Sequence, residues 1–205
     1  MRTGILGGTF DPVHSGHLRI ARAAYEQFAL DRVLFMPSGN PPHKQRRWSS
    51  DRDRAAMIRL AIKDTPFFAF SDFEMHPEKG AYTYTYQTLE KMKAADPGND
   101  IFFIIGEDSL KDFPIWRHPE RIAALCTLLV APRETAAGEA LSEKIRQVRE
   151  TFSADIERID VEMLPISSHE VREAAAEGAS LESFLPEAVA AYIRSNHLYV
   201  NHEIS

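Results

Sequence analysis

Residues Gly4–His17 read GILGGTFDPVHSGH, and the interpretation of the whole sequence starts from this stretch. It begins as an apolar strand, passes through the pair Gly7 and Gly8, and enters a helix whose first turn holds His14 and His17. Two glycines after a strand let the backbone approach a bulky polar group closely. A helix N-terminus presents unpaired N–H groups and a partial positive charge, which favour an anion. The junction therefore predicts a phosphate site, with both imidazoles on one side of the helix as hydrogen-bond donors.

Two common phosphate motifs do not fit this junction. The P-loop requires a lysine after its second glycine, and the dinucleotide fingerprint requires G-x-G-x-x-G; GGTFDP provides neither. A zinc site on His14 and His17 and a simple turn with incidental histidines stay open as alternatives. Against zinc, H-E-x-x-H is absent and the single cysteine, Cys126, lies far along the sequence.

Short β-rich runs alternate with helical periodicity along the rest of the chain. The predicted strands are Thr3–Leu6, Arg32–Met36, Phe67–Phe70, Ile101–Ile105, Cys126–Val130 and Arg158–Leu164. Most of the early runs are continuously apolar, which is typical of strands buried on both sheet faces. Between the runs, apolar residues recur at helical spacing after Ser15, after a cap signal at Asp51, after Thr85, from Leu141 and near the C-terminus. This alternation predicts an α/β fold, a Rossmann-like open parallel sheet with helices on both faces. We expect one domain, 1–205, whose C-terminal part from about 167 is helical.

Composition narrows the class of protein. The 205 residues carry 24 Lys+Arg against 30 Asp+Glu, a net charge of −6, with 44% hydrophobic residues, so a disordered chain is excluded. No apolar run approaches the ~20 residues of a membrane span, and no secretory signal is visible. One cysteine forms no internal disulfide, and we expect a cytoplasmic protein. The mild acidity predicts no general nucleic-acid surface, and a homo-oligomer stays open.

A second motif near the C-terminus leads to a family resemblance. The G-T-F-D-P-x-H-x-G-H pattern resembles the nucleotidyltransferase superfamily with the H-x-G-H signature, whose second element has the form I-S-S-T-x-I-R. Here Ile166–Arg172 reads ISSHEVR, with His169 in place of threonine and Val171 in place of isoleucine. Ser168 is also a good N-cap for a helix running to Glu177. Arg172 could meet the same phosphates from the other side.

Further matches are similar to the bacterial nicotinate-nucleotide adenylyltransferases within that superfamily. Asn40–Lys44 (NPPHK) resembles a loop of that family, and Thr83–Leu89 (TYTYQTL) resembles its S-Y-T-x-D-T-L helix start, with Gln87 in place of aspartate. Gly106–Asp108 (GED) resembles its G-x-D segment. Trp116 falls where the family carries an aromatic residue for the nicotinate ring. The resemblance covers nearly the whole chain.

The resemblance implies a reaction in NAD biosynthesis. The 5′-phosphate of nicotinate mononucleotide attacks the α-phosphorus of ATP, giving nicotinate adenine dinucleotide and pyrophosphate. Because the second pKa of a phosphomonoester is about 6, the nucleophile is ionised at neutral pH and no general base is needed. The site has to position two anions and neutralise charge on phosphoryl oxygens. We expect Mg²⁺ to be carried by the ATP phosphates, with no protein cage.

The resemblance also implies roles for individual residues. We assign His17 the main transition-state role and His14 a supporting role on the phosphates. The expected ATP and phosphate contacts are Gly7, Gly8, Thr9, Phe10, Lys44, Arg46, Gly106, Asp108, Ile166, Ser167, Ser168 and Arg172. The expected nicotinate mononucleotide contacts are Asn40, Tyr84, Thr85 and Trp116, with the helix start at Thr85 holding the carboxylate and Trp116 stacking on the ring. Helix capping for Thr85 and simple packing for Trp116 are alternative roles.

Other functions stay open at this point. Phosphopantetheine adenylyltransferase shares both signature elements, but it leaves the TYT element and Trp116 unexplained, and a cytidylyltransferase fits less well. A non-catalytic nucleotide-binding sensor is a second class, against which the intact His14, His17, Lys44 and Arg172 argue. A histidine-ligated metallohydrolase is a third, which metal analysis would separate.

Overall fold

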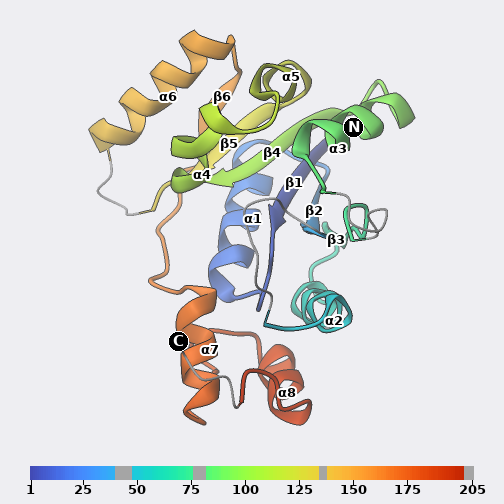
Figure 1. The fold of residues 1–205 in the computed structure, drawn as a ribbon, viewed down its shortest axis with the longest axis vertical. Helices are drawn as coiled ribbons and strands as arrows, with labels where there is room; N and C mark the ends of the chain where they lie inside the picture. The colour runs from blue at the N-terminus through green and yellow to red at the C-terminus, as the bar shows by residue number, and fades with distance from the viewer. Residues whose placement is uncertain (40–47, 76–81, 134–137, 201–205) are drawn as a thin grey trace.

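Six parallel strands form the centre of the molecule, in the order β3-β2-β1-β4-β5-β6 (Figure 1). They are β1 (Arg2–Gly8), β2 (Arg32–Pro37), β3 (Phe68–Phe70), β4 (Asp100–Gly106), β5 (Thr127–Ala131) and β6 (Ile156–Arg158). The computed structural model describes residues 1–39, 48–75, 82–133 and 138–200. Every neighbouring pair of strands is parallel, so the predicted α/β class is confirmed.

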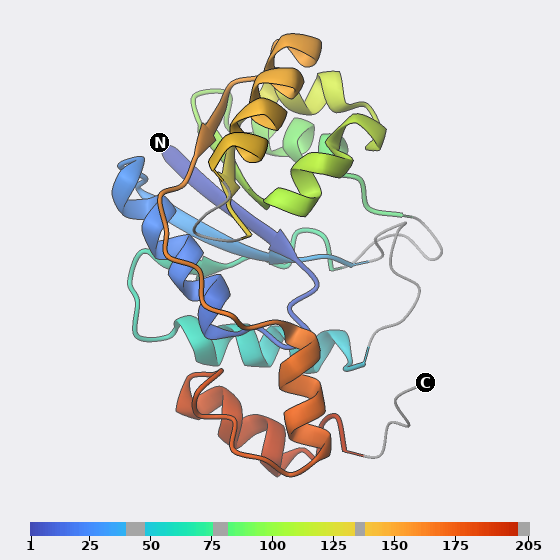
Figure 2. The same cartoon turned by 90° about the vertical axis from the view of Figure 1, so that its left-hand side faces the viewer.

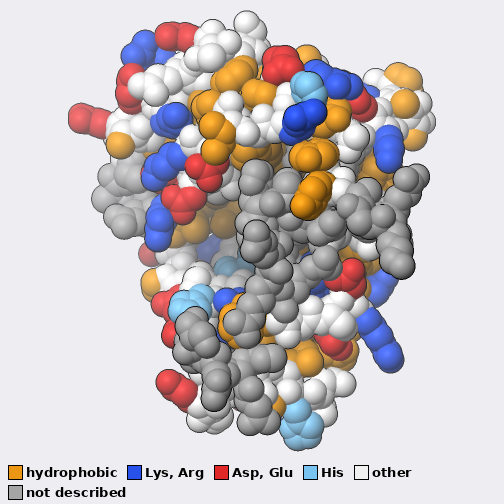
Figure 3. All heavy atoms as spheres, in the orientation of Figure 1, with side chains coloured by type: hydrophobic (Ala, Val, Ile, Leu, Met, Phe, Trp, Pro, Cys, Tyr) orange, Lys and Arg blue, Asp and Glu red, His pale blue; other side chains and the backbone are white. Residues whose placement is uncertain are grey.

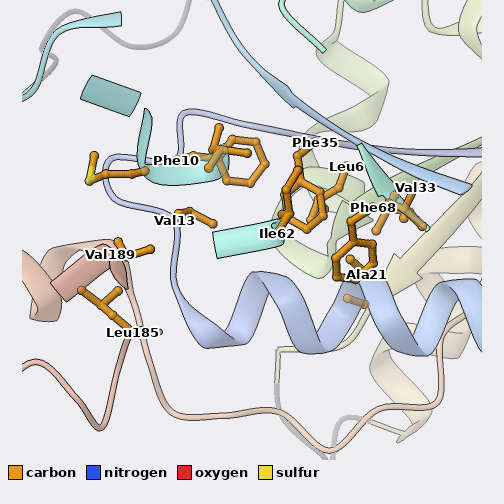
Figure 4. Close-up of a cluster of buried hydrophobic side chains, with 14 of the residues drawn as sticks. Leu6, Phe10, Val13, Ala21, Val33, Phe35, Ile62, Phe68, Leu185 and Val189 are labelled. Carbon is orange, nitrogen blue, oxygen red and sulfur yellow. The ribbon is translucent and has the colours of Figure 1, made fainter. Parts of the chain in front are cut away.

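Alternate residues of the central strands point into two hydrophobic cores. Leu6 of β1 and Ile104 of β4 belong to the core on one sheet face, and Ile5 and Phe103 belong to the core on the other. This two-sided burial explains why the strand sequences are continuously apolar. Figure 4 shows part of the first core, in which Leu6 and its neighbours on the sheet lie over the helix that follows β1.

The helices cover both faces of the sheet. They are α1 (Ser15–Gln27), α2 (Asp51–Ile62), α3 (Thr85–Ala95), α4 (Glu107–Asp112), α5 (Pro119–Leu125), α6 (Gly138–Phe152), α7 (Ser168–Ala176) and α8 (Glu187–Ser195), with a 3-10 turn η1 (Phe113–Ile115). Residues of α1, α2, α7 and α8 share the first core, whereas residues of α3, α4, α5 and α6 share the second. Among these helices, none combines the length and apolar composition that a membrane crossing requires.

Helix boundaries differ from the sequence prediction in three places. The short elements α4, η1 and α5 have no counterpart in the prediction, because three to seven residues are too few to display a helical period. The N-cap of α2 is Ser50 rather than Asp51, and its hydroxyl accepts the Asp53 N–H at 3.1 Å. The N-cap of α7 is Ser167, which forms a capping box with Glu170, so Ser168 is the first helical residue and not the cap.

The predicted strand Arg158–Leu164 is wrong in its position. β6 ends at Arg158, and after one further bond, from the Ile159 N–H to the Val130 carbonyl, the chain leaves the sheet and runs along α1 (Figure 2). The side-chain amide of Gln27 in α1 replaces a neighbouring strand there. It donates to the Asp160 carbonyl at 2.5 Å and accepts the Asp160 N–H at 2.8 Å. The alternating apolar pattern is therefore buried against a helix.

The Gln27 contact generates a stability prediction. Gln27→Ala removes both bonds to Asp160, and we expect it to lower the free energy of unfolding by about 1 kcal/mol and to speed amide exchange at Asp160. The matched control is Arg19→Ala, which removes the exposed Arg19–Glu162 ion pair from the same segment and should cost less than about 0.5 kcal/mol. Urea unfolding and hydrogen exchange measure both. Equal effects of the two variants would contradict the role given to Gln27.

Candidate active site

The strand order reverses between β1 and β4, and the end of each strand is open there. In open α/β sheets, ligands bind in the crevice at such a switch point, beyond the carboxyl ends of the strands. Gly7 and Gly106 are both exposed at this edge. A Cβ atom added at Gly106 would meet no atom within 4 Å, so space exists beside it. Figure 3 shows a hollow between the sheet and the C-terminal helices, with basic and imidazole side chains at its bottom.

The loop from β1 to α1 has its carbonyl groups turned toward side chains and backbone outside the loop. The Gly8 carbonyl accepts the Ser38 N–H at 2.8 Å, and the Thr9 carbonyl accepts Arg54 Nη1 at 2.7 Å. In a trans peptide the C=O and the following N–H point in opposite directions. The N–H groups of Thr9 and Phe10 must therefore point away from Ser38 and Arg54. That these loop N–H groups bind phosphate stays a prediction.

Two more carbonyls of the loop are held by α7. The Asp11 carbonyl accepts Arg172 Nη1 at 2.7 Å, and the Pro12 carbonyl accepts the Ser168 hydroxyl at 2.9 Å. Ser168 and Arg172 of the ISSHEVR segment thus hold the loop through its carbonyl groups. Phe10 lies between Thr9 and Asp11, whose carbonyls are both hydrogen-bonded. Its φ is 51°, in the left-handed region that non-glycine residues seldom adopt, and its ring is buried. The loop conformation is therefore fixed by tertiary contacts.

The rings of His14 and His17 lie against each other at the start of α1, on one side of the helix as their spacing predicts. Their ring centroids lie 3.7 Å apart, and the His14 backbone N–H donates to His17 Nδ1 at 3.2 Å. Because Nδ1 accepts this bond, the proton of the neutral His17 ring is on Nε2. The Ser15 N–H is already bonded to the Phe184 carbonyl at 2.9 Å. The bond to Nδ1 also orients the His17 ring, so its Nε2–H is a side-chain donor with a fixed direction at this helix start.

His14 is buried and held neutral. Its side chain is 8% exposed, and within the described residues its Nδ1 has no hydrogen-bond partner. Desolvation lowers its pKa from 6.5 to about 4, outweighing the opposing effect of the Glu170 carboxylate. A Cβ atom at Gly16 would lie 3.0 Å from His14 Nδ1, so a glycine between the two histidines leaves room for the His14 ring.

Sequence reasoning missed two buried charged residues, one within the loop and one that contacts it from α2. Asp11 is 4% exposed, and Arg54 is fully buried. Arg54 donates to the carbonyls of Thr9 and Ser38 and pairs with Asp51 at 2.6 Å. A signal for Arg54 does exist, because an arginine lies on the apolar face of the predicted helix next to Ala55 and Ile58. Its partners Thr9 and Ser38, however, lie 45 and 16 positions away, and no local sequence pattern indicates these two contacts.

The predicted nicotinate half of the site lies at α3 and the η1–α5 turn. α3 begins at Thr85 with Tyr84 at the N-cap position and no side-chain cap, so the capping alternative for Thr85 is not what the structure has. Trp116 is partly buried, with its ring centroid 6.4 Å from that of Phe103 and 5.7 Å from that of Phe113. It is thus packed on two sides and partly exposed.

The remaining predicted residues divide into three groups. Asn40, Lys44 and Arg46 lie outside the described residues. Asp108 is at the expected sheet edge, where it pairs with Arg133 at 3.1 Å, a residue that sequence reasoning did not select. Ile166 packs against the first core, and Ser167, Ser168 and Arg172 make the capping and loop contacts given above.

Comparison with known proteins assigns the family. The cytidylyltransferase-like family model matches residues 5–174. A curated relative from Lachnoclostridium phytofermentans, "Probable nicotinate-nucleotide adenylyltransferase", is 39% identical over 97% of this chain and 99% of its own length. A relative of the same name from Synechococcus sp. is 42% identical over 98% of this chain and 95% of its own. The chain belongs to the nicotinate-nucleotide adenylyltransferases of this family.

Solved structures agree in fold with this adenylyltransferase chain. The Plasmodium falciparum nicotinic acid mononucleotide adenylyltransferase complexed with NaAD has a TM-score of 0.76 at 18% identity and covers 97% of both chains. The same enzyme complexed with APC has a TM-score of 0.74 at 18% identity, covering 97% of this chain and 96% of its own. The family resemblance inferred from the motifs is confirmed. Within the described part of the adenylyltransferase, no group of three or more His, Cys, Asp or Glu side chains is placed to hold a metal ion.

The buried His14 generates a pH prediction for the adenylyltransferase. Its pKa is about 4 in the folded protein and 6.5 when unfolded, so on acidification the unfolded chain takes up the proton first. Stability present above pH 6.5 is therefore lost between pH 6.5 and 4, by on the order of 1–3 kcal/mol. His14→Asn, which keeps a good N-cap but cannot titrate, should lose correspondingly less. Urea unfolding across this range measures it, and an unchanged slope in the variant would contradict the burial of a neutral ring.

Proposed function

We propose that this protein transfers the adenylyl group of ATP to nicotinate mononucleotide, giving nicotinate adenine dinucleotide and pyrophosphate in NAD biosynthesis. The observation that carries the proposal is the pair of adjacent imidazoles, His14 and His17, at the start of the helix that follows β1 and its exposed Gly7. Relatives about 40% identical over nearly their full length carry the name of this activity.

The chemistry requires orientation and charge stabilisation. An oxygen of the nicotinate mononucleotide 5′-phosphate forms a bond to the α-phosphorus of ATP, and the bond from that phosphorus to the β-bridging oxygen breaks. Pyrophosphate leaves with the electron pair. We assign the His17 Nε2–H to an α-phosphate oxygen, where negative charge grows, because its orientation is fixed before substrate binds. The N–H groups of Thr9 and Phe10 are assigned to the attacking phosphate.

The nicotinate ring is assigned to the partly exposed face of Trp116, and its carboxylate to the start of α3 at Thr85. A helix start favours a carboxylate, since its N–H groups carry a partial positive charge. No acidic residue occupies the first turn of α3, so nothing in that turn opposes the anion. This assignment predicts a preference for the acid over the amide form of the mononucleotide.

Magnesium is assigned to the triphosphate, and the remaining partners follow from the reaction. Mg²⁺ prefers to bind through substrate phosphates with few protein ligands, and it would neutralise charge on the leaving pyrophosphate. The proposed partners are ATP and nicotinate mononucleotide, with no nucleic acid and no membrane, in a cytoplasmic protein. A homo-oligomer stays open.

A substrate panel tests the proposed function. We expect pyrophosphate release with ATP and nicotinate mononucleotide, lower kcat/KM with nicotinamide mononucleotide, and none with phosphopantetheine. Equal kcat/KM for the two mononucleotides would overturn the roles of Thr85 and Trp116. Turnover of phosphopantetheine instead would favour the alternative adenylyltransferase, and nucleotide binding without turnover would favour a sensor. Stoichiometric zinc in the purified protein would favour a metallohydrolase.

The role of His17 is tested by removing its ring. His17→Ala should lower kcat by roughly 10²–10³-fold, the scale for losing one preorganised donor to a developing charge. Circular dichroism and a thermal melt confirm that the variant is folded. A folded variant with near-normal turnover would contradict the assigned role, whatever the substrate panel shows.

A further inference from the structure

The Asp11 carboxylate lies inside the loop that we assign to phosphate, yet its oxygens are occupied by protein donors. Oδ1 accepts the Ser49 hydroxyl at 2.6 Å and the Tyr199 hydroxyl at 2.8 Å. Oδ2 accepts the Trp48 N–H at 2.7 Å and the Ser49 N–H at 3.3 Å. An ionised carboxylate has about four lone-pair sites, and these four bonds use them. Asp11 is therefore in no position to act as a general base or to bind a metal.

An anion beside a phosphate site is unfavourable for binding by itself. At close range a carboxylate repels phosphate oxygens, and burial strengthens the repulsion. Attraction to the phosphate, general-base catalysis and metal binding therefore do not explain why an aspartate lies at this position. Its contacts do offer an explanation, because they join three segments that are far apart in sequence: the β1–α1 loop, the residues before α2, and the C-terminal segment.

The bond from the Tyr199 hydroxyl to Asp11 spans the longest sequence separation of these contacts. Tyr199 is separated from Asp11 by 188 positions and is 3% exposed. Its hydroxyl also lies 3.4 Å from Ser49 Oγ, so the three side chains form one buried cluster. Asp11 is held at its backbone too, through the Arg172 bond to its carbonyl. Because its carboxylate and its backbone carbonyl are both hydrogen-bonded, Asp11 also restrains the residues immediately before it. These are Thr9 and Phe10, whose N–H groups we assign to the attacking phosphate.

From this geometry we propose that Tyr199, acting through Asp11, is a positioning residue for adenylyl transfer. Through this contact, the C-terminal segment fixes the position and orientation of the β1–α1 loop relative to His14 and His17. This inference rests on the proposed function. It makes the end of the described chain part of the catalytic apparatus, although Tyr199 itself touches no substrate.

The chain provides a matched control for removing the Tyr199 hydroxyl. Tyr192 in α8 makes a similar phenol–carboxylate bond, to Asp53 Oδ1 at 2.9 Å, which joins α8 to α2 and does not reach Asp11. Tyr199→Phe and Tyr192→Phe each delete one hydroxyl and keep the ring. Both should lower the melting temperature by a few degrees. A merely structural role for Tyr199 would make the two variants alike in every other respect.

Kinetics separate the two roles. With ATP and nicotinate mononucleotide, we expect Tyr199→Phe to lower kcat by roughly 10-fold, with both KM values within about twofold of wild type, since misplacing reacting groups costs rate more than affinity. Tyr192→Phe should keep kcat within about twofold. The proposal is overturned if Tyr199→Phe keeps wild-type kcat, or if both variants lose kcat equally.

A spectroscopic measurement tests the inference without turnover. The bond from the His14 N–H to His17 Nδ1 depends on the loop, and it sets the ¹⁵N shift of that imidazole nitrogen. In the substrate-free protein, Tyr199→Phe should move the His17 Nδ1 signal while Tyr192→Phe leaves it in place. An unmoved signal in both variants would overturn the positioning role. If wild type failed to use nicotinate mononucleotide, only the proposed function would fall, and this comparison would still decide the inference.

Discussion

The loop between β1 and α1 depends on donors that come from outside it. Four of its carbonyls, from Gly8, Thr9, Asp11 and Pro12, accept hydrogen bonds from β2, α2 and α7 or the residues beside them. In the peptides that follow Gly8 and Thr9, bonding the carbonyl on one side leaves the N–H of the next residue directed to the other side. The two bonds to the Gly8 and Thr9 carbonyls therefore also orient the N–H groups that we assign to the phosphate. The buried arginine Arg54 makes one of these four bonds and also donates to the Ser38 carbonyl.

The histidine pair adds a donor whose proton is located in advance. The His14 N–H bond fixes the His17 tautomer, and burial keeps His14 uncharged. Binding two anionic substrates needs positive potential, whereas catalysis needs donors that do not reorganise during the reaction. A neutral, oriented imidazole meets the second need. The arginines beneath the loop and the partial charges of its N–H groups contribute to the first.

Much of the fold follows from the sequence, and its errors have identifiable causes. Two-sided burial makes β1, β2, β4 and β5 continuous apolar runs, which is why they are predicted correctly. The run Arg158–Leu164 has the same alternation as a strand, but Gln27 of α1 occupies the place of a strand partner. The N-cap at Ser167 rather than Ser168 differs by one residue, because two adjacent serines carry equal capping propensity and Glu170 selects between them.

For the site, the sequence by itself identified the elements that we assign to the reaction: the glycine pair, the two histidines three residues apart, and their place between a strand and a helix. Local spacing fixes these, since a strand end and the first turn of a helix involve fewer than fifteen consecutive residues. Only the tertiary structure decided the His17 tautomer, the neutrality of His14, and the contacts of Asp11 with Ser49 and Tyr199. These properties arise from burial and from bonds between residues up to 188 positions apart, which no local pattern encodes.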